Sequence, residues 1–458
     1  MKIFTSCNLV FVLLFAILKF SSAQQSDLLQ FPPGLLIPNY NRTPVGQNEA
    51  AEGGAFVARS SGLAANWYNP AGLALAESLS LNAGSSGYEL IKLKLDGFQN
   101  TPRSLTANGT PGFIGIVTKS PFKTAKRVRL GFSFGQQSSW QPNFDSNTKL
   151  NDASESDQLS IAYKLKFSTT APALAFGVIS NPRFRWGFGI QVPFTTLTIY
   201  ESIGDQVLNS THVVSNLINL RVNGLEIQLI GVGGVQYSFS DKIIVGGLIK
   251  SPTIRIWDNA QISYESIQSG TDSSKSVVFH DKNASFHYRF PLQLSCGIAY
   301  KSVYYQLEAD LNYYNGSKPY TVIESSNQVT QILTNAGETF TTKSLGFPDL
   351  EYDRNYVLNA AFGGNFKFAE LFRIHGGLFT DFSPVNKTNS TIFRKINLYG
   401  TTFGLSICSE KFSGGVGFKY SFGRSESFKI WENISPEPTN THLSVNTFTI
   451  IWALSLEL

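Results

Sequence analysis

The stretch "NTFTIIWALSLEL" (Asn446–Leu458) at the end of the chain alternates between large apolar and small or polar side chains. Side chains of a β-strand point to opposite faces in turn, so residues of one parity share a face. One face is formed by Phe448, Ile450, Trp452, Leu454, Leu456 and Leu458. The other face carries small or polar residues, with Ile451 as the large apolar exception. The stretch therefore predicts an amphipathic strand, long enough to cross a bilayer at a tilt.

Five further stretches repeat this alternation: "FRWGFGIQV" (184–192), "VYYQLEADL" (303–311), "NYVLNAAFGGNFKF" (355–368), "LYGTTFGLSI" (398–407) and "FSGGVGFKYSF" (412–422). Their apolar faces are rich in Phe, Tyr and Trp, and their polar faces in Gly, Ser, Thr and Asn. A soluble β-sandwich or propeller would also alternate, but charges would keep its outer face in water. Aromatic residues outside and small polar residues inside are typical of a barrel in lipid.

We therefore predict an all-β fold, a transmembrane antiparallel β-barrel of about fourteen strands. Only 15% of the residues are charged, against about 25% in soluble proteins. No stretch beyond the leader has about 18 apolar residues, so no spanning helix is expected. Short turns at 239–242 and 409–411, and longer polar segments at 266–284, 315–352 and 383–395, predict tight turns at one end and loops at the other.

The first 23 residues have the pattern of a secretory signal peptide. Lys2 gives a positive start, residues 9–18 ("LVFVLLFAIL") are apolar, and Ser21-Ser22-Ala23 supplies small residues for cleavage. This pattern predicts export. Cys296 and Cys408 remain in the mature chain. They are too few for a disulfide framework, and we expect both to be buried thiols.

Residues 24–75 do not alternate. A Pro-rich piece (27–44) is followed by the Gly- and Ala-rich run "NEAAEGGAFVARSSGLAANWYNPAGLA" (48–74). The apolar content of this run argues against disorder, and a barrel of this size has a bore that must be filled. We expect residues 1–23 to be a signal peptide, 24–75 a plug in the lumen and 76–458 the barrel.

Three stretches together resemble the FadL/TodX family of outer-membrane transport proteins for long-chain fatty acids and hydrocarbons. The first is "GGAFVARSSGLAANWY" (53–68), followed by Asn69-Pro70-Ala71, after which we expect the first strand to begin at once. The others are "IQLIGVGGVQYSFSDKIIVGGLIKSP" (227–252) and "FRIHGGLFTDFSPV" (372–385). The resemblance implies passive uptake of hydrophobic molecules through an apolar lumenal pocket, closed by an N-terminal hatch. It also implies release sideways into the membrane, beside a kinked strand.

Asn69, Pro70 and Ala71 are the candidate hatch residues. Pro70 has no N–H and disfavours helix at Asn69, and an Asn side chain can bond to nearby backbone. The tripeptide is either an ordinary turn between plug and barrel or, as the resemblance implies, an element that holds the hatch closed. Gly131 and Gly135 share a face of "VRLGFSFGQQSSW" (128–140). They mark either the kinked wall strand or room for the plug.

Charged residues also fall on the inner face by parity: Arg185, Glu308, Asp310, Arg373, His375, Asp381 and Lys419. We expect most of them to form ion pairs that stiffen the wall and hold the plug. One basic residue, Arg373 or Lys419, is a candidate to contact the carboxylate of a fatty acid.

Catalytic and metal-binding patterns are not found in the sequence. The His residues are scattered, and "GVGG" (231–234) lies in a predicted strand rather than before a helix. No basic run is interleaved with aromatics, so nucleic acid is not an expected partner. We expect a monomer in a Gram-negative-type outer membrane, without enzymatic activity, cofactor or metal. Its partners would be hydrophobic small molecules and membrane lipid.

Two alternatives stay open. The substrate could be an aromatic hydrocarbon instead of a fatty acid, since both would use similar apolar walls. The protein could also be a general porin or a structural barrel. A porin should have a constriction loop with opposed charges and no apolar plug, and the apolar segment 45–75 argues against it.

Overall fold

The computed structural model describes residues 38–40, 45–46, 48–76, 79–96, 103–109, 112–119, 127–150, 156–208, 213–270, 273–335, 341–346, 350–386, 394–409, 411–425 and 442–457. The predicted signal peptide (1–23) lies outside this part of the chain, as does most of the Pro-rich piece 27–44.

The described strands make fourteen antiparallel passes around one closed barrel. Seven passes are continuous: β1 (Ser80–Asp96), β6 (Ser156–Asn181), β9 (Val213–Ser238), β20 (Phe372–Asp381), β21 (Ile396–Cys408), β22 (Phe412–Ser425) and β23 (His442–Glu457). The barrel closes because β1 pairs with β23 over most of its length, from Leu81 opposite Leu456 to Leu93 opposite Val445. The predicted barrel of about fourteen strands is confirmed.

The other seven passes are interrupted. They are β2 (Arg103–Gly109) with β3 (Phe113–Lys119), β4 (Val128–Trp140) with β5 (Asn143–Leu150), β7 (Phe184–Gln191) with β8 (Phe194–Leu208), β10 (Ile243–Lys250) with β11 (Ile254–Ser269), β12 (Ser273–Phe286) with β13 (Gln293–Lys301), β14 (Tyr305–Tyr314) with β15 (Ser317–Glu324) and β16 (Gln328–Asn335), and β17 (Thr341–Gly346) with β18 (Leu350–Arg354) and β19 (Val357–Lys367).

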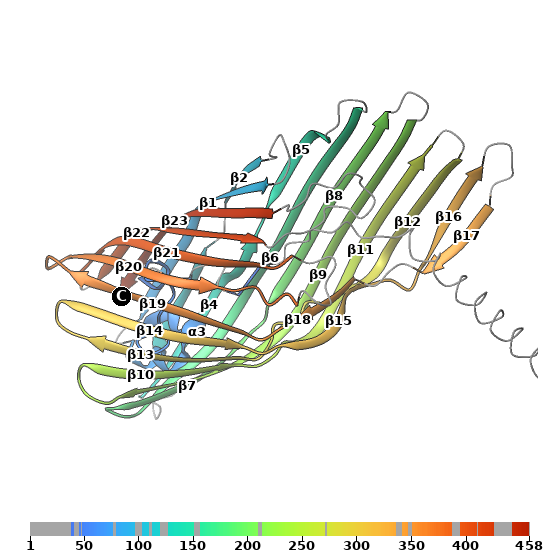
Figure 1. Ribbon diagram of the computed structural model, residues 1–458. Helices are drawn as coiled ribbons and strands as arrows, with labels where there is room; N and C mark the ends of the chain where they lie inside the picture. Colours follow the sequence, from blue (N-terminus) through green and yellow to red (C-terminus); the bar gives the residue numbers. More distant parts are fainter. Residues whose placement is uncertain are drawn as a thin grey trace, which may run out of the picture.

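Prolines stand at most of these interruptions: Pro142, Pro193, Pro252 and Pro291, with Pro384 just after β20. Proline has no N–H to give to a β-ladder, so it ends the pairing where it occurs. The breaks divide the barrel at what we call the waist (Figure 1). The lower section holds β7, β10, β13, β14, β19 and the chain's C-terminal end. The upper section holds β5, β8, β11, β12, β16 and β17.

Side-chain polarity reverses at the waist, and β6 shows the reversal within one strand. In the lower section its outward Leu174 is 51% exposed, and its inward Ala173 is buried. In the upper section its inward Leu165 and Phe167 are buried, and its outward Lys166 is exposed. The lower section therefore has an apolar outer surface, and the upper section has an apolar interior with a polar outer face.

Two predictions from the sequence are wrong, and the reversal explains the first. The segments 266–284 and 315–352, expected as polar loops, largely continue β11 and β12 and form β15 to β18. Their inward Phe279 and Tyr320 pack in the upper interior, so apolar residues there do not mark a lipid-facing surface. Cys296, expected to be buried, lies exposed on the apolar outer face of β13, and Cys408 is only half-buried.

Four short helical turns lie inside the lower section: α2 (Asn48–Ala51), η1 (Gly62–Ala64), α3 (Ala65–Tyr68) and η2 (Pro70–Leu75). We call the described residues between 38 and 76 the inner segment. Most of its side chains are buried, including Leu63, Trp67 and Leu73. Among the described residues, no helix is both long and apolar enough to cross a membrane.

Candidate functional site

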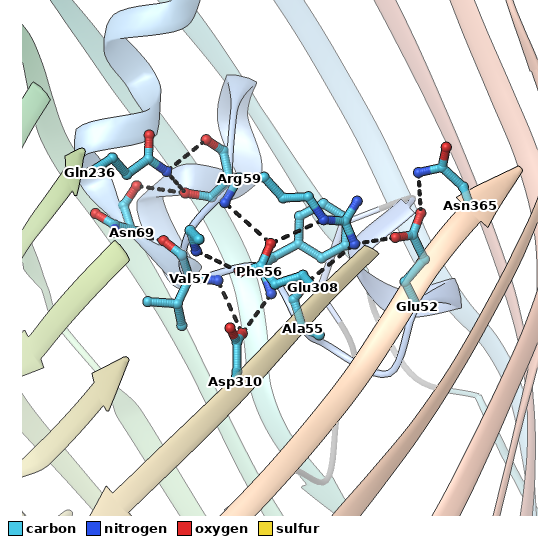
Figure 2. A network of polar contacts seen from close by, with 12 residues as sticks. Glu52, Ala55, Phe56, Val57, Arg59, Asn69, Gln236, Glu308, Asp310 and Asn365 are labelled. Atoms are coloured by element: carbon cyan, nitrogen blue, oxygen red, sulfur yellow. Dashed lines mark hydrogen bonds and ion pairs between the residues drawn. The ribbon is translucent and has the colours of Figure 1, made fainter. Parts of the chain in front are cut away.

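Two carboxylates on β14 hold the inner segment by its backbone (Figure 2). Asp310 accepts the N–H groups of Phe56 at 2.8 Å and Val57 at 3.1 Å. Glu308 accepts the next two N–H groups, at 2.5 and 3.2 Å. Residues two apart in a strand share a face, so both carboxylates point into the lumen. Four consecutive N–H groups of a turn, which would otherwise be buried without partners, are thereby satisfied.

Arg59 joins this pair of carboxylates to a third one, Glu52. Its guanidinium bonds to Glu52, and its Nε lies 3.0 Å from Glu308. Glu52 also accepts from Asn365 at 3.0 Å and lies 2.6 Å from His375 Nδ1. Burial by itself raises the pKa of Glu52, but the hydrogen bonds and charges of His375 and Arg59 outweigh it, so that its pKa is lowered. The arrangement favours the ionised carboxylate in the docked state.

Asn69 links the inner segment to a nearby part of the wall, strands β9 and β10. Its fully buried side-chain amide donates to the carbonyls of Val57 (2.7 Å), Val235 (3.0 Å) and Gly247 (3.3 Å). Its Oδ1 accepts the N–H of Ala71 at 3.1 Å and so begins η2. Pro70 and Ala71 therefore start a helical turn, and β1 begins only at Ser80. The tripeptide does not run directly into the first strand.

Glycines in the wall allow the inner segment to lie directly on the strands. A Cβ at Gly234 would fall 2.0 Å from Asn69 Oδ1, and one at Gly363 would fall 1.9 Å from the carbonyl of Glu52. A Cβ at Gly246 would lie 2.3 Å from the carbonyl of Val57. Atoms cannot approach so closely, so these positions tolerate glycine alone while the inner segment is docked.

A cavity of about 180 Å³ lies between the inner segment and the waist. Its wall combines aromatic, aliphatic and amide side chains with two lysines, Lys250 and Lys419. Above it, Phe167 and Tyr288 are fully buried and pack edge-to-face at 4.8 Å within the apolar upper interior. The cavity therefore lies between the inner segment and this packed part of the upper interior.

The two candidate carboxylate-binding residues fall in different places. Lys419 lines the cavity, with its Nζ 4.8 Å above the ring of Phe379. Arg373 is the second residue of β20, beside the short turn that follows β19, and is not among the described residues that line the cavity. Of these two candidates, only Lys419 can meet a ligand held in this cavity.

The two candidate glycines of β4 face the inner segment. A Cβ at Gly131 would lie 2.5 Å from Asn66 Oδ1, and one at Gly135 would lie 3.3 Å from the Trp67 ring. Both positions leave room for the inner segment. The irregularity in β4 comes next, as a bulge between Gln136 and Ser138 that lines the cavity.

Strands β2 and β5 meet only loosely beyond this bulge. Pairing of β3 with β4 ends at Phe113 opposite Gly135. Among the described residues, no ladder pairing joins β2 to β5. Their contacts include bonds from the side chains of Thr106 and Asn108 to the backbone at 141–143. The wall beside the bulge is thus held by side chains rather than by a continuous ladder.

The other charged residues that were predicted to face inward differ in their hydrogen-bond and ion-pair partners. His375 lies between Glu52 and Ser406, 2.7 Å from the Ser406 hydroxyl. Asp381 is buried at the waist, where its backbone carbonyl accepts from Asn39 at 2.8 Å. Arg185 contacts Ser238 at 3.4 Å and has no ion pair to any described residue. Ion pairing therefore does not extend to every inward charge.

Sequence reasoning missed Lys250 and the segment around Tyr40. Lys250 shares its parity with Leu248, which is buried, so the inward position could have been read from the strand pattern. Tyr40 stacks on Tyr314 with ring centroids 4.1 Å apart. It belongs to the Pro-rich piece, which carries no periodic signal. No group of His, Cys, Asp or Glu that could hold a metal occurs in the part of the chain that the structure describes.

Comparisons with known proteins identify the fold. No family model and no curated protein matches the sequence. Among solved structures, a Pseudomonas aeruginosa FadL homologue superposes with a TM-score of 0.58 at 13% identity, covering 93% of this chain and 99% of that one. The toluene transporter TodX of P. putida superposes with a TM-score of 0.58 at 13% identity, covering 92% of this chain and 99% of that one. The toluene transporter TbuX of Ralstonia pickettii superposes with a TM-score of 0.53 at 13% identity, covering 92% of this chain and 99% of that one. The chain has the fold of the FadL/TodX barrels, as the sequence resemblance implied.

Proposed function

We propose that the protein is an outer-membrane channel for passive uptake of hydrophobic small molecules. The observation that carries the proposal is the cavity inside the barrel, which is lined on one side by the docked inner segment. A general porin would need an open aqueous bore. The solved proteins that share the fold include a FadL homologue and toluene transporters. We propose neither a catalytic role nor a cofactor.

The apolar outer surface of the lower section supports a place in a lipid bilayer. Large outward side chains there are about half exposed, among them Phe132, Leu311, Phe362 and Phe403. So broad an apolar surface is not tolerated in water. The short turns at this end would face the periplasm, and the upper section would extend outside the cell, as in other outer-membrane barrels.

The inner segment would act as the hatch. A ligand enters the cavity from the upper section, displaces the docked inner segment and leaves through the wall. Asn69, with Pro70 and Ala71, would hold the hatch closed by tying Val57 to β9 and β10. Release beside the β4 bulge would place the ligand in the membrane, because β2 and β5 lack a ladder there. Gly131 and Gly135 would then serve chiefly to seat the hatch.

Two substrate classes are proposed for the cavity. A long-chain fatty acid is the first, with its carboxylate near Lys419. A monoaromatic hydrocarbon is the second, favoured by the compact volume of the cavity and its many aromatic side chains. Both share an apolar body that would lie against residues such as Leu248 and Phe290.

Equilibrium binding in nanodiscs tests the function, because no detergent competes there for the cavity. We expect saturable binding of radiolabelled palmitate or toluene to the full chain, above that of empty nanodiscs. A variant with Val57→Trp, which fills the space between hatch and cavity, should bind less. Steady ion conductance in a planar bilayer, without saturable binding of either probe, would instead identify a porin.

A further inference from the structure

The charges on the cavity wall are of one sign. Lys250 and Lys419 line the cavity, and none of its described lining residues is Asp or Glu. Lys250, the last residue of β10, has no hydrogen bond or ion pair to any described residue. An ammonium group in an enclosed site is costly without a counter-charge or full hydration. The wall therefore favours a ligand that brings a negative charge.

The wall beside Lys250 is apolar. In the ladders, Lys250 lies opposite Val232 of β9 and Gln293 of β13. One apolar cluster adjoins it, which we call the apolar shelf, formed by Val57, Ile230, Val232 and Leu248, with Phe290 packed against it. A ligand whose charge meets Lys250 would lay its apolar part on the shelf. A ligand that matches both the charge of Lys250 and the apolar shelf is an amphipathic anion.

The size of the cavity limits that apolar part. Its volume of about 180 Å³ is close to the roughly 150 Å³ of an apolar cavity that holds one benzene. Packed Phe167 and Tyr288 close it above, and the stacked pair of Tyr40 and Tyr314 lies on its wall. A long straight chain would extend beyond a volume of this size. Eight of the 28 lining residues are aromatic, which suits a flat ring.

We propose that this cavity takes a ring-sized organic carboxylate, an aromatic acid, with its carboxylate at Lys250 and its ring against the apolar shelf. The inference rests on the proposed uptake function and names the substrate class of the same cavity. A neutral arene would fit but would leave the Lys250 ammonium without a counter-charge. A long-chain fatty acid would supply the charge, but most of its chain would lie outside the cavity.

A matched set of probes tests this assignment on the full chain in nanodiscs near neutral pH. 4-Methylbenzoate and toluene differ only in the carboxylate, and palmitate supplies a long chain. We expect wild type to bind 4-methylbenzoate more tightly than toluene. Lys250→Met removes the charge and keeps most of the length of the side chain. It should weaken the binding of 4-methylbenzoate by roughly tenfold or more, the effect of losing one charged hydrogen bond. Its affinity for toluene should change little.

Controls separate charge from folding. Lys250→Arg should retain most of the affinity for 4-methylbenzoate, and Lys301→Met, at an exposed position outside the cavity, should match wild type. Unchanged binding in Lys250→Met, or loss in Lys419→Met alone, overturns the assignment to Lys250. Binding of palmitate or toluene with none of 4-methylbenzoate overturns the substrate class but leaves the uptake function standing. Failure of all three probes to bind wild type contradicts the uptake function itself.

Discussion

At the scale of single residues, the inner segment is held by a few buried polar side chains with several bonds each. Asn69 makes three bonds from its amide, to one carbonyl of the inner segment and two of the wall. Asp310 and Glu308 accept four backbone N–H groups between them. If the inner segment undocked, each of these polar groups would lack a hydrogen-bond partner unless water took that place. Docking is therefore tight only while the whole set is formed.

Replacement of Asn69 should loosen the inner segment without unfolding the barrel. In Asn69→Ala the carbonyls of Val57 and Val235 lose their donor, and we expect docking to weaken by about 2 kcal/mol. Hydrogen exchange of residues 55–75 should rise, while exchange in the strands of the wall stays unchanged. Asn181→Ala, which removes similar bonds in an exposed turn, is the control. Equal exchange in both variants would contradict a docking role for Asn69.

Docking should also weaken in acid, through Glu52. Its pKa is lowered from the ordinary value of 4.5, so the carboxylate stabilises the docked state above that value. This stabilisation is lost as the pH falls through the lowered pKa. We expect the protection of residues 55–60 against hydrogen exchange to fall below about pH 4.5, and Glu52→Gln to show a flatter protection profile over the same range. Identical profiles for both proteins would exclude Glu52 as the titrating group.

At the scale of elements, the strands of the lower section are built to receive the inner segment. Their inner face carries glycines where the inner segment comes closest, such as Gly363 on β19 and Gly377 on β20, both against Glu52. Their outer face carries large apolar side chains. The alternation of glycine with aromatic residues thus serves two contacts at once, with the inner segment on one side and with lipid on the other.

Two neighbouring glycines of β20 should respond differently to one added methyl group. A Cβ at Gly377 would lie 2.4 Å from the backbone of Glu52, whereas one at Gly376 finds its nearest atom 3.9 Å away. We expect Gly377→Ala to displace the inner segment and to raise proteolysis within residues 48–60, and Gly376→Ala to behave like wild type. The elution volume and circular dichroism of both should show an intact barrel. Equal proteolysis would mean that the close approach does not limit docking.

At the scale of the whole molecule, the reversal of polarity at the waist sets the position of the protein in a membrane. The lower section presents Phe403 and its outward neighbours to lipid, and the upper section presents polar side chains such as Thr198. The prolines at the waist end the ladders where the two environments meet. The apolar upper interior packs on itself above the cavity.

Charge substitutions on the two outer surfaces should therefore have unequal costs. Phe403→Arg places a guanidinium in the apolar band, where such a change costs about 2–4 kcal/mol near the midplane of a bilayer. Thr198→Arg places the same group on the polar upper surface and should cost little. Folding free energies in lipid vesicles, measured by denaturant titration, check this pair. A similarly small loss of folding free energy for both variants would mean that the lower section does not lie in the apolar part of the bilayer.

The sequence by itself determined the class of fold and much of its detail. Alternation over 412–422 and 446–458 predicts strands with a lipid-facing side, because a period of two is a local property of the chain. The glycine- and alanine-rich run 48–74 predicts a segment packed in a confined space, because small residues allow close approach. Inward parity also places Glu308 and Asp310 in the lumen without knowledge of their partners.

Only the tertiary structure decided which face is apolar at each height and which residues meet. Along β6 the apolar face changes from outward to inward, although the period of two is unchanged. For the same reason, the sequence of 266–284 and 315–352 could not show that these residues form strands of a packed upper section. The cavity joins Lys250 of β10 with Lys419 of β22, from passes on different sides of the barrel. Contacts of that kind depend on closure between β1 and β23, a pairing of segments more than 300 residues apart that no local pattern encodes.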